Sequence, residues 1–227
     1  MTPYYADDQV TLYLGDCREV TEWLAADVLV TDPPYGIGWS RGKWAATYNP
    51  AGHDGIQGDS DTSVRDAALA AWGASRPALM FGSLRAAYPA GWKRMLVFRK
   101  PTIGAGLYGN RMPWFSNWEP VFALGPWPDQ VPTFDAVIAT RAASGSGYSG
   151  YATRYGHPHA KPVDVMETLI GACPDGVIAD PFAGSGSTLV AARNLGRRAI
   201  GVEVDERYAE RAAKRLCQDV LISGALT

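Results

Sequence analysis

Short apolar runs recur along the chain, and most of them end at an acidic, glycine or proline residue. Runs of β-type character cover residues 10–14, 28–31, 78–81, 94–98, 119–124, 177–179 and 199–202. Between them apolar residues return at helical spacing, which predicts helices near residues 19–24, 63–72, 163–171 and 189–192. Because strand and helix signals alternate, we expect an α/β fold with a parallel sheet covered by helices on both faces.

Composition indicates a single globular domain. The chain has 227 residues, of which 47% are hydrophobic, and this is enough for one sizeable core. No apolar run is as long as a membrane span, and residues 1–5 lack the start of a secretion signal, so we expect a cytoplasmic protein. Cys17, Cys173 and Cys217 are few and widely spaced, which favours reduced thiols over disulfides or a metal cage. We expect no metal.

The apolar run at 28–31 leads directly into Asp32, Pro33, Pro34 and Tyr35. The two prolines fix φ and lack N–H donors, so the Pro33 carbonyl is a rigid, free acceptor. Asp32 adds a second acceptor and Tyr35 a flat π-face. Two acceptors beside a stacking surface suit a planar substrate with an NH2 group, and a nucleobase fits best. The alternative is a strand that ends at prolines and whose Asp caps the next turn.

A glycine-rich turn follows the run at 177–179, between Asp180 and the next expected helix. Such a turn presents backbone N–H groups and a helix N-terminus to a ligand. Leu189 replaces the third glycine of the dinucleotide pattern, and no Lys-Ser or Lys-Thr pair follows the last glycine, so phosphate binding is disfavoured. Glu203 ends the next strand about twenty residues later, where a carboxylate accepts ribose hydroxyls. We expect a nucleoside cofactor, most simply S-adenosylmethionine; the alternative is a structural turn with a surface Glu.

Charge is unevenly distributed along the chain. Residues 85–161 hold nine basic and three acidic residues, a net of +6, which leaves −8 for the rest of a chain with net charge −2. The same region is interleaved with aromatic residues: Trp92, Tyr108, Trp114, Trp118, Trp127, Tyr148, Tyr151 and Tyr155. Basic and aromatic residues together favour a groove that binds phosphates and stacks bases. The alternative is that the aromatics belong to the core and the bases to a solvated surface.

Two stretches show no regular pattern. Residues 36–62 are rich in Gly, Asn, Asp and Ser, and we expect them to form a mobile lid in which Trp39, Trp44 and Tyr48 contact the substrate base or pack. Residues 125–156 contain prolines and a Ser-Gly run that predict an irregular insert.

Three motifs occur in a definite order: Asp32-Pro33-Pro34-Tyr35, then His-Pro-His-Ala-Lys-Pro at 157–162, then Asp-Pro-Phe-Ala-Gly-Ser-Gly at 180–186. In this order they resemble the beta group of DNA amino-methyltransferases, in which the catalytic motif precedes the cofactor motif. The resemblance covers most of the chain outside the insert. It implies a Rossmann-like, mostly parallel seven-stranded sheet, S-adenosylmethionine as cofactor and double-stranded DNA as partner.

The resemblance also implies an order of parts within the single domain. The catalytic half corresponds to residues 1–124, a small target-recognition insert to 125–156, and the cofactor-binding half to 157–227. Because the insert is short, we expect a short or relaxed target site, and mapping of modified sites that found a long, strict sequence would refute this.

The resemblance assigns the family's catalytic and cofactor-binding residues to individual positions of this sequence. Asp32, Pro33, Pro34 and Tyr35 match the catalytic motif that holds a flipped base, and Glu119 lies in a stretch similar to a family segment near that base. The residues assigned to the cofactor are Asp16, Cys17, Lys161, Pro162, Asp180, Phe182, Gly184, Gly186, Thr188 and Glu203. The family's pattern assigns the first of these to the adenine, the last to the ribose, and the Lys-Pro pair to the methionine end.

The implied reaction is methyl transfer to the exocyclic N6 of adenine, since Asp opens the catalytic motif whereas Ser commonly opens it in cytosine-N4 enzymes. Hydrogen bonds to Asp32 and the Pro33 carbonyl would expose the lone pair of the amine, and Tyr35 would stabilise the developing positive charge. Cytosine-C5 methylation is disfavoured because no Pro-Cys pair occurs. Three alternatives stay open: a cytosine-N4 DNA methyltransferase, an RNA or protein amide methyltransferase, and a catalytically idle DNA-binding protein.

Overall fold

The computed structural model describes residues 1–38, 55–100, 117–129, 133–140 and 160–224. The strands are β1 (Tyr5–Ala6), β2 (Val10–Leu14), β3 (Val28–Thr31), β4 (Ala78–Phe81), β5 (Trp92–Arg99), β6 (Trp118–Leu124), β7 (Val137–Ala139), β8 (Ile178–Asp180) and β9 (Ala199–Glu203). The helices are the 3-10 helix η1 (Glu22–Ala25) and the α-helices α1 (Ser63–Trp72), α3 (Val163–Gly171), α4 (Ser187–Asn194) and α5 (Glu206–Gly224).

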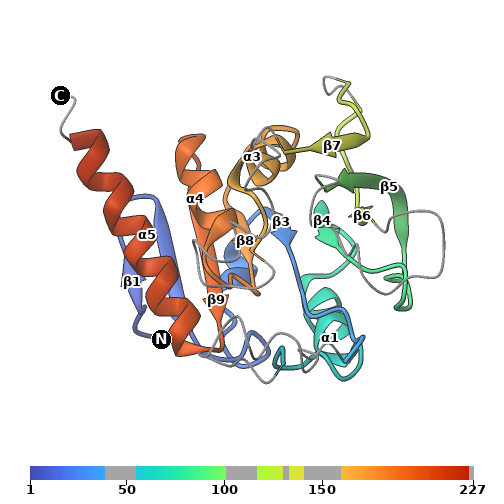
Figure 1. Cartoon of the computed structure of the whole chain (residues 1–227), viewed down its shortest axis with the longest axis horizontal. Coiled ribbons are helices and arrows are strands. Elements are labelled where there is room, and N and C mark those ends of the chain that lie inside the picture. The colour runs from blue at the N-terminus through green and yellow to red at the C-terminus, as the bar shows by residue number, and fades with distance from the viewer. Residues whose placement is uncertain (39–54, 101–116, 130–132, 141–159, 225–227) are drawn as a thin grey trace.

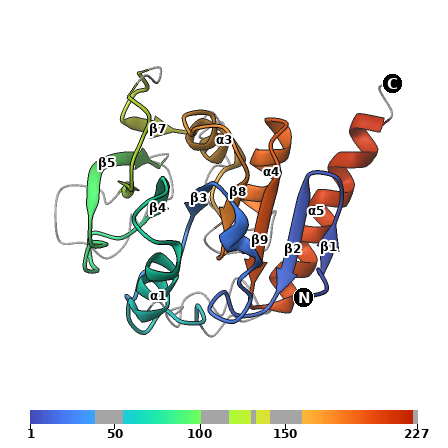
Figure 2. The same cartoon turned by 180° about the vertical axis from the view of Figure 1, so that it is seen from behind.

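One mixed sheet runs through the molecule in the order β1-β2-β9-β8-β3-β4-β6-β5-β7. Its centre, from β2 through β9, β8 and β3 to β4, is parallel throughout, and β6 pairs antiparallel with both β4 and β5. Strand β1 and helix α5 lie at one end of the molecule, and β5 and β7 lie at the other (Figures 1 and 2). The expected Rossmann-like, mostly parallel sheet is confirmed. The parallel centre brings the carboxyl ends of five strands to one edge.

Helices cover both faces of the sheet, as the unbroken apolar strands predict. Val28 and Val30 of β3 face a core cluster that includes residues of α3, α4 and α5. Leu29, between them, faces a second cluster on the opposite side, with η1 and α1. In that cluster the rings of Trp23 and Trp72 stack with centroids 5.9 Å apart. Burial on both faces fixes the register of β3 and therefore the position of the residues that follow it.

The described part of the chain has nine strands where the apolar runs predicted seven. The two additional strands, β1 and β7, are short and lie at the two edges of the sheet. Strand β7 lies in the segment where prolines predicted irregular structure; it pairs with β5, and only its middle residue, Ile138, is buried. The helix expected near residues 19–24 is instead a turn at Asp16 followed by the short η1. Such short elements leave too little periodicity to be recognised in a sequence.

Gly186 allows α4 to begin close to α5. Its φ of +82° lies in the left-handed region, and a Cβ there would lie 2.9 Å from Ala212 Cβ and 3.2 Å from Ala212 Cα. We expect Gly186→Ala to lower the free energy of unfolding by about 2–4 kcal/mol, from backbone strain and overpacking together. Gly196→Ala is the matched control, since Gly196 has φ +69° at the left-handed position after α4, where the Arg197 N–H donates to the Ala192 carbonyl, and nothing lies within 4 Å of its added Cβ.

Urea unfolding of both variants separates the two contributions. The Gly196 variant should lose only the left-handed backbone cost, about 1–2 kcal/mol. Equal losses in the two variants would show that the approach of α4 to α5 contributes nothing.

Candidate active site

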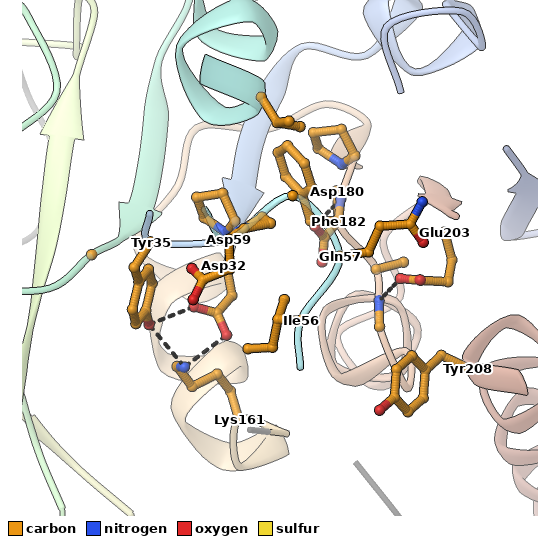
Figure 3. A pocket seen from close by; sticks show the side chains of 18 of the residues that line it. Asp32, Tyr35, Ile56, Gln57, Asp59, Lys161, Asp180, Phe182, Glu203 and Tyr208 are labelled. Atoms are coloured by element: carbon orange, nitrogen blue, oxygen red, sulfur yellow. Dashed lines mark hydrogen bonds and ion pairs between the residues drawn. The ribbon is translucent and has the colours of Figure 1, made fainter. Parts of the chain in front are cut away.

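A cavity of about 440 Å³ lies at the carboxyl edge of the parallel strands. This is where α/β sheets hold their ligands, because the loops that follow the strands converge there. The sequence-predicted residues that line it are Asp16, Cys17, Asp32, Pro33, Pro34, Tyr35, Glu119, Lys161, Asp180, Phe182, Gly184, Thr188 and Glu203. Asp32, Tyr35 and Lys161 occupy one side of the cavity, and Glu203 and Tyr208 occupy the other (Figure 3). One cavity thus brings together residues of the three motifs at 32–35, 157–162 and 180–186.

Two predicted cofactor residues do not line the cavity. Pro162 is buried at the start of α3, where its carbonyl accepts a hydrogen bond from the Met166 N–H at 3.2 Å. Gly186 is the N-cap of α4. The predicted lid aromatics Trp39, Trp44 and Tyr48 lie outside the described residues, as do residues 130–132 and 141–156 of the insert.

A triangle of hydrogen bonds holds the loop of residues 32–35, which is named the catalytic loop after the family motif that it matches. The Tyr35 hydroxyl donates to Asp32 Oδ1 at 2.7 Å, and Lys161 Nζ donates to Asp32 Oδ2 at 2.7 Å and to the Tyr35 oxygen at 3.1 Å (Figure 3). Lys161 comes from the segment that the resemblance assigns to the methionine end of the cofactor, and here its ammonium group contacts the Asp32 carboxylate. The triangle fixes both Asp32 oxygens, and each keeps a lone pair for a substrate donor.

Burial governs the ionisation of this loop. It raises the pKa of Asp32 above its ordinary value, and the Lys161 ammonium acts in the opposite direction. Burial, followed by the neighbouring Asp32, raises the pKa of Tyr35 well above its ordinary value. Tyr35 therefore stays a neutral phenol that donates to Asp32 and presents an uncharged ring to the cavity.

Two further carboxylates organise the glycine turn. Asp180 Oδ1 accepts hydrogen bonds from the Thr31 hydroxyl at 2.6 Å and from the Phe182 N–H at 3.1 Å. Glu203 Oε2 accepts from the Gly184 N–H at 2.6 Å, and its Oε1 accepts from the Asp205 N–H at 2.8 Å. Each Glu203 oxygen keeps a free lone pair.

Burial raises the pKa of Asp180 to about 6 and that of Glu203 to about 7. The chemistry of this part of the cavity fits S-adenosylmethionine. Glu203 offers two acceptors for the two ribose hydroxyls, and Phe182 offers an apolar face. The glycine turn contains no lysine that could bind a phosphate, which agrees with a nucleoside cofactor that has no phosphates.

Cys17 and Cys173 are unsuited to nucleophilic catalysis. Burial raises the pKa of Cys17 and of Cys173 to about 12, so both thiols are neutral. Within the described residues there is also no cluster of His, Cys, Asp and Glu side chains that could hold a metal ion. Nor does any described helix have the length and apolar character needed to cross a membrane.

Asp59 and Tyr208 line the cavity although no sequence motif marked them. Asp59 is buried, and its Oδ1 accepts the Gly36 N–H at 2.8 Å, which anchors the chain directly after the catalytic loop. Gly36 has φ +74° and lies too close to Asp61 to carry a side chain. The signal for Asp59 was only its place in a polar, glycine-rich segment, and the signal for Tyr208 was its closeness to Glu203.

Sequence comparison identifies related methylases. Residues 114–215 match the N6/N4 methyltransferase family model, described as DNA methylase. A putative methylase of Escherichia coli strain K12, YubD, is 33% identical over 224 residues, which cover 89% of this chain and 88% of that protein. The type II methyltransferase M.ScaI of Streptomyces caespitosus is 48% identical over 65 residues, which cover 28% of this chain and 21% of that protein.

Solved structures share the fold over most of the chain. The M1.HpyAVI complex with S-adenosylmethionine has a TM-score of 0.56 at 20% identity and covers 91% of this chain and 99% of that one. The cytosine-N4-specific PvuII DNA methyltransferase has a TM-score of 0.59 at 15% identity and covers 93% and 87%. With its catalytic loop ahead of its glycine turn, this chain belongs to the beta group of S-adenosylmethionine-dependent DNA amino-methyltransferases, which includes the methyltransferases of restriction-modification systems.

Proposed function

We propose that this DNA methyltransferase modifies the exocyclic N6 of adenine, and that the adenine is turned out of the duplex into the cavity. The observation that carries the proposal is the Asp32 carboxylate at the head of the catalytic loop, held by Tyr35 and Lys161 beside the cavity. Ser commonly stands at this position in cytosine-N4 enzymes of the family. The fold it shares with a cytosine-N4 enzyme does not distinguish the two bases.

The residues of this chain align and activate a weak nucleophile. The bound cofactor supplies a methyl group on a sulfonium, which is already a good electrophile. Asp32 and the Pro33 carbonyl accept the two N–H bonds of the base, so its nitrogen becomes more tetrahedral. The S–C bond to the methyl group would break as the N–C bond forms, and the cofactor would leave as a neutral thioether. The positive charge that develops on the nitrogen is stabilised by the Asp32 carboxylate and the Tyr35 ring. The nitrogen then releases one proton to solvent, and no covalent enzyme intermediate forms.

The position of these groups supports base extrusion. Asp32 lies in the cavity with its side chain only 20% exposed, where a base stacked in a duplex cannot reach it. Binding of the base in this cavity compensates for the loss of stacking in the duplex. We assign the choice of target sequence to residues 125–156. A 2-aminopurine placed at the target position should become more fluorescent when the protein binds, because it leaves the stack.

Mass spectrometry of nucleosides tests the choice of base. Unmethylated duplex DNA is incubated with the protein and S-adenosylmethionine, digested and analysed. N6-methyladenine is the expected product. N4-methylcytosine would keep the mechanism and change the base, and methylation of structured RNA but not DNA would favour the RNA alternative.

The same proposal places the protein in the cytoplasm with double-stranded DNA as its partner, and it requires no metal. Activity that persists after treatment with a chelator is the expected result.

A further inference from the structure

Lys161 Nζ lies at a point where three oxygen atoms from two parts of the fold meet. They are Asp32 Oδ2 at 2.7 Å and the Tyr35 oxygen at 3.1 Å, both in the loop after β3, and Glu119 Oε2 at 3.3 Å, from β6. The ammonium group also lies 4.9 Å from the centroid of the Phe81 ring. The side chain is only 4% exposed. A buried cation so close to the reacting position affects the chemistry directly, because water screens it little.

Glu119 is held by a second lysine on its far side. Lys100, which follows β5, forms an ion pair with Glu119 Oε1, and both side chains line the cavity. The two lysines lower the pKa of Glu119 below its ordinary value, although burial acts in the opposite direction. Charges therefore alternate along the chain of contacts from Asp32 through Lys161 and Glu119 to Lys100.

The alternation of charge affects the reaction because positive charge develops on the substrate nitrogen beside Asp32. Lys161 alone would cancel the charge of Asp32 and remove its benefit in the transition state. With Glu119 in contact with the same ammonium group, the three groups carry a net charge of −1. Lys100 lies beyond Glu119 and is 18% exposed, so it is screened more than Lys161.

We infer that Glu119 is a positioning residue for methyl transfer: it neutralises and orients Lys161, so that Lys161 can hold Asp32 without cancelling its negative charge. This inference rests on the proposed methyl transfer to an exocyclic amine and holds for either base. It differs from a direct contact of Glu119 with the substrate, because the effect of Glu119 then depends on the presence of Lys161.

A double-mutant cycle tests this dependence. Glu119→Gln should lower kcat by about 10–100-fold, since Lys161 is left to cancel Asp32, while KM for DNA and cofactor changes little. Lys161→Met should also lower kcat, because Asp32 and Glu119 then repel each other. The double variant restores a local charge of −1 and should be about 5–50-fold more active than Glu119→Gln alone. A double variant no better than Glu119→Gln would overturn the inference.

Controls keep the test independent of folding and of the base. Glu210→Gln and Lys214→Met remove an exposed ion pair on α5 and should leave kcat unchanged. If Glu119→Gln loses cofactor binding, Glu119→Asp decides the question: it keeps the charge and should retain most of kcat, and a loss as large as that of Lys161→Met would overturn the inference. A wild-type protein that methylates no amine on DNA would instead refute the proposed function, and it is measured first.

Discussion

Asp32→Asn is expected to lower kcat for methyl transfer to DNA by about 10²–10³-fold, the usual cost of losing one group that stabilises developing charge. The variant has the same size, but its amide carries no charge and offers one acceptor oxygen instead of two. It also leaves the Lys161 ammonium, which donates to Asp32 Oδ2 at 2.7 Å, without its carboxylate. The reaction loses both the acceptor for the substrate amine and the stabilisation of positive charge.

Two measurements show where the loss occurs. Transfer of a labelled methyl group gives kcat, and calorimetry gives the cofactor Kd, which should stay unchanged because Asp32 lies across the cavity from Glu203 (Figure 3). Asp8→Asn, at an exposed position, is the control and should behave as wild type. Nearly full activity of Asp32→Asn would contradict the assignment of the catalytic loop.

Glu203→Gln is expected to weaken S-adenosylmethionine binding by about 10–100-fold, since a hydrogen bond to a charged group contributes about 1.5–3 kcal/mol. Its amide can accept at one oxygen only, so it cannot serve both ribose hydroxyls. It also cannot hold both the Gly184 and the Asp205 N–H groups, which Glu203 accepts at 2.6 and 2.8 Å. Calorimetric titration measures the change, with Glu210→Gln on exposed α5 as the control.

The pH dependence of cofactor binding tests the same residue. Burial raises the pKa of Glu203 from 4.5 to about 7 in the free protein. Ribose hydroxyls donate to the ionised form, so affinity should be full above pH 7 and fall by up to about tenfold per unit as the pH is lowered through this value. The Glu203→Gln variant should lose most of this dependence and keep only a weaker one from Asp180, whose pKa is about 6. Parallel pH profiles for wild type and variant would exclude Glu203 as the titrating group.

The acidic residues predicted to act in the site lie at or directly after the carboxyl ends of parallel strands. Asp180 and Glu203 end strands β8 and β9, and Asp32 directly follows β3. Parallel pairing of these strands brings their carboxyl ends to one edge, and this is why the three carboxylates line the same cavity. The two faces of β3 were likewise predictable, because its apolar run is uninterrupted.

The contacts that tune the site could not be predicted in the same way. Lys161 bonds Asp32 across 129 positions of sequence, and its motif pointed to the cofactor instead of the catalytic carboxylate. Asp59 bonds Gly36 through a fold of the polar segment that has no periodicity. Such contacts depend on the three-dimensional placement of loops, which turn residues restrict but do not determine.

We expect the cavity that holds Asp32 and Glu203 to transfer a methyl group from S-adenosylmethionine to an adenine N6 in DNA. The most direct test uses cofactor with an isotopically labelled methyl group, unmethylated duplex DNA, and the wild-type and Asp32→Asn proteins side by side. Labelled N6-methyladenine with the wild type, and almost none with the variant, is the expected result. Label in 5-methylcytosine, no labelled nucleoside with the wild type, or equal label with both proteins would contradict the account.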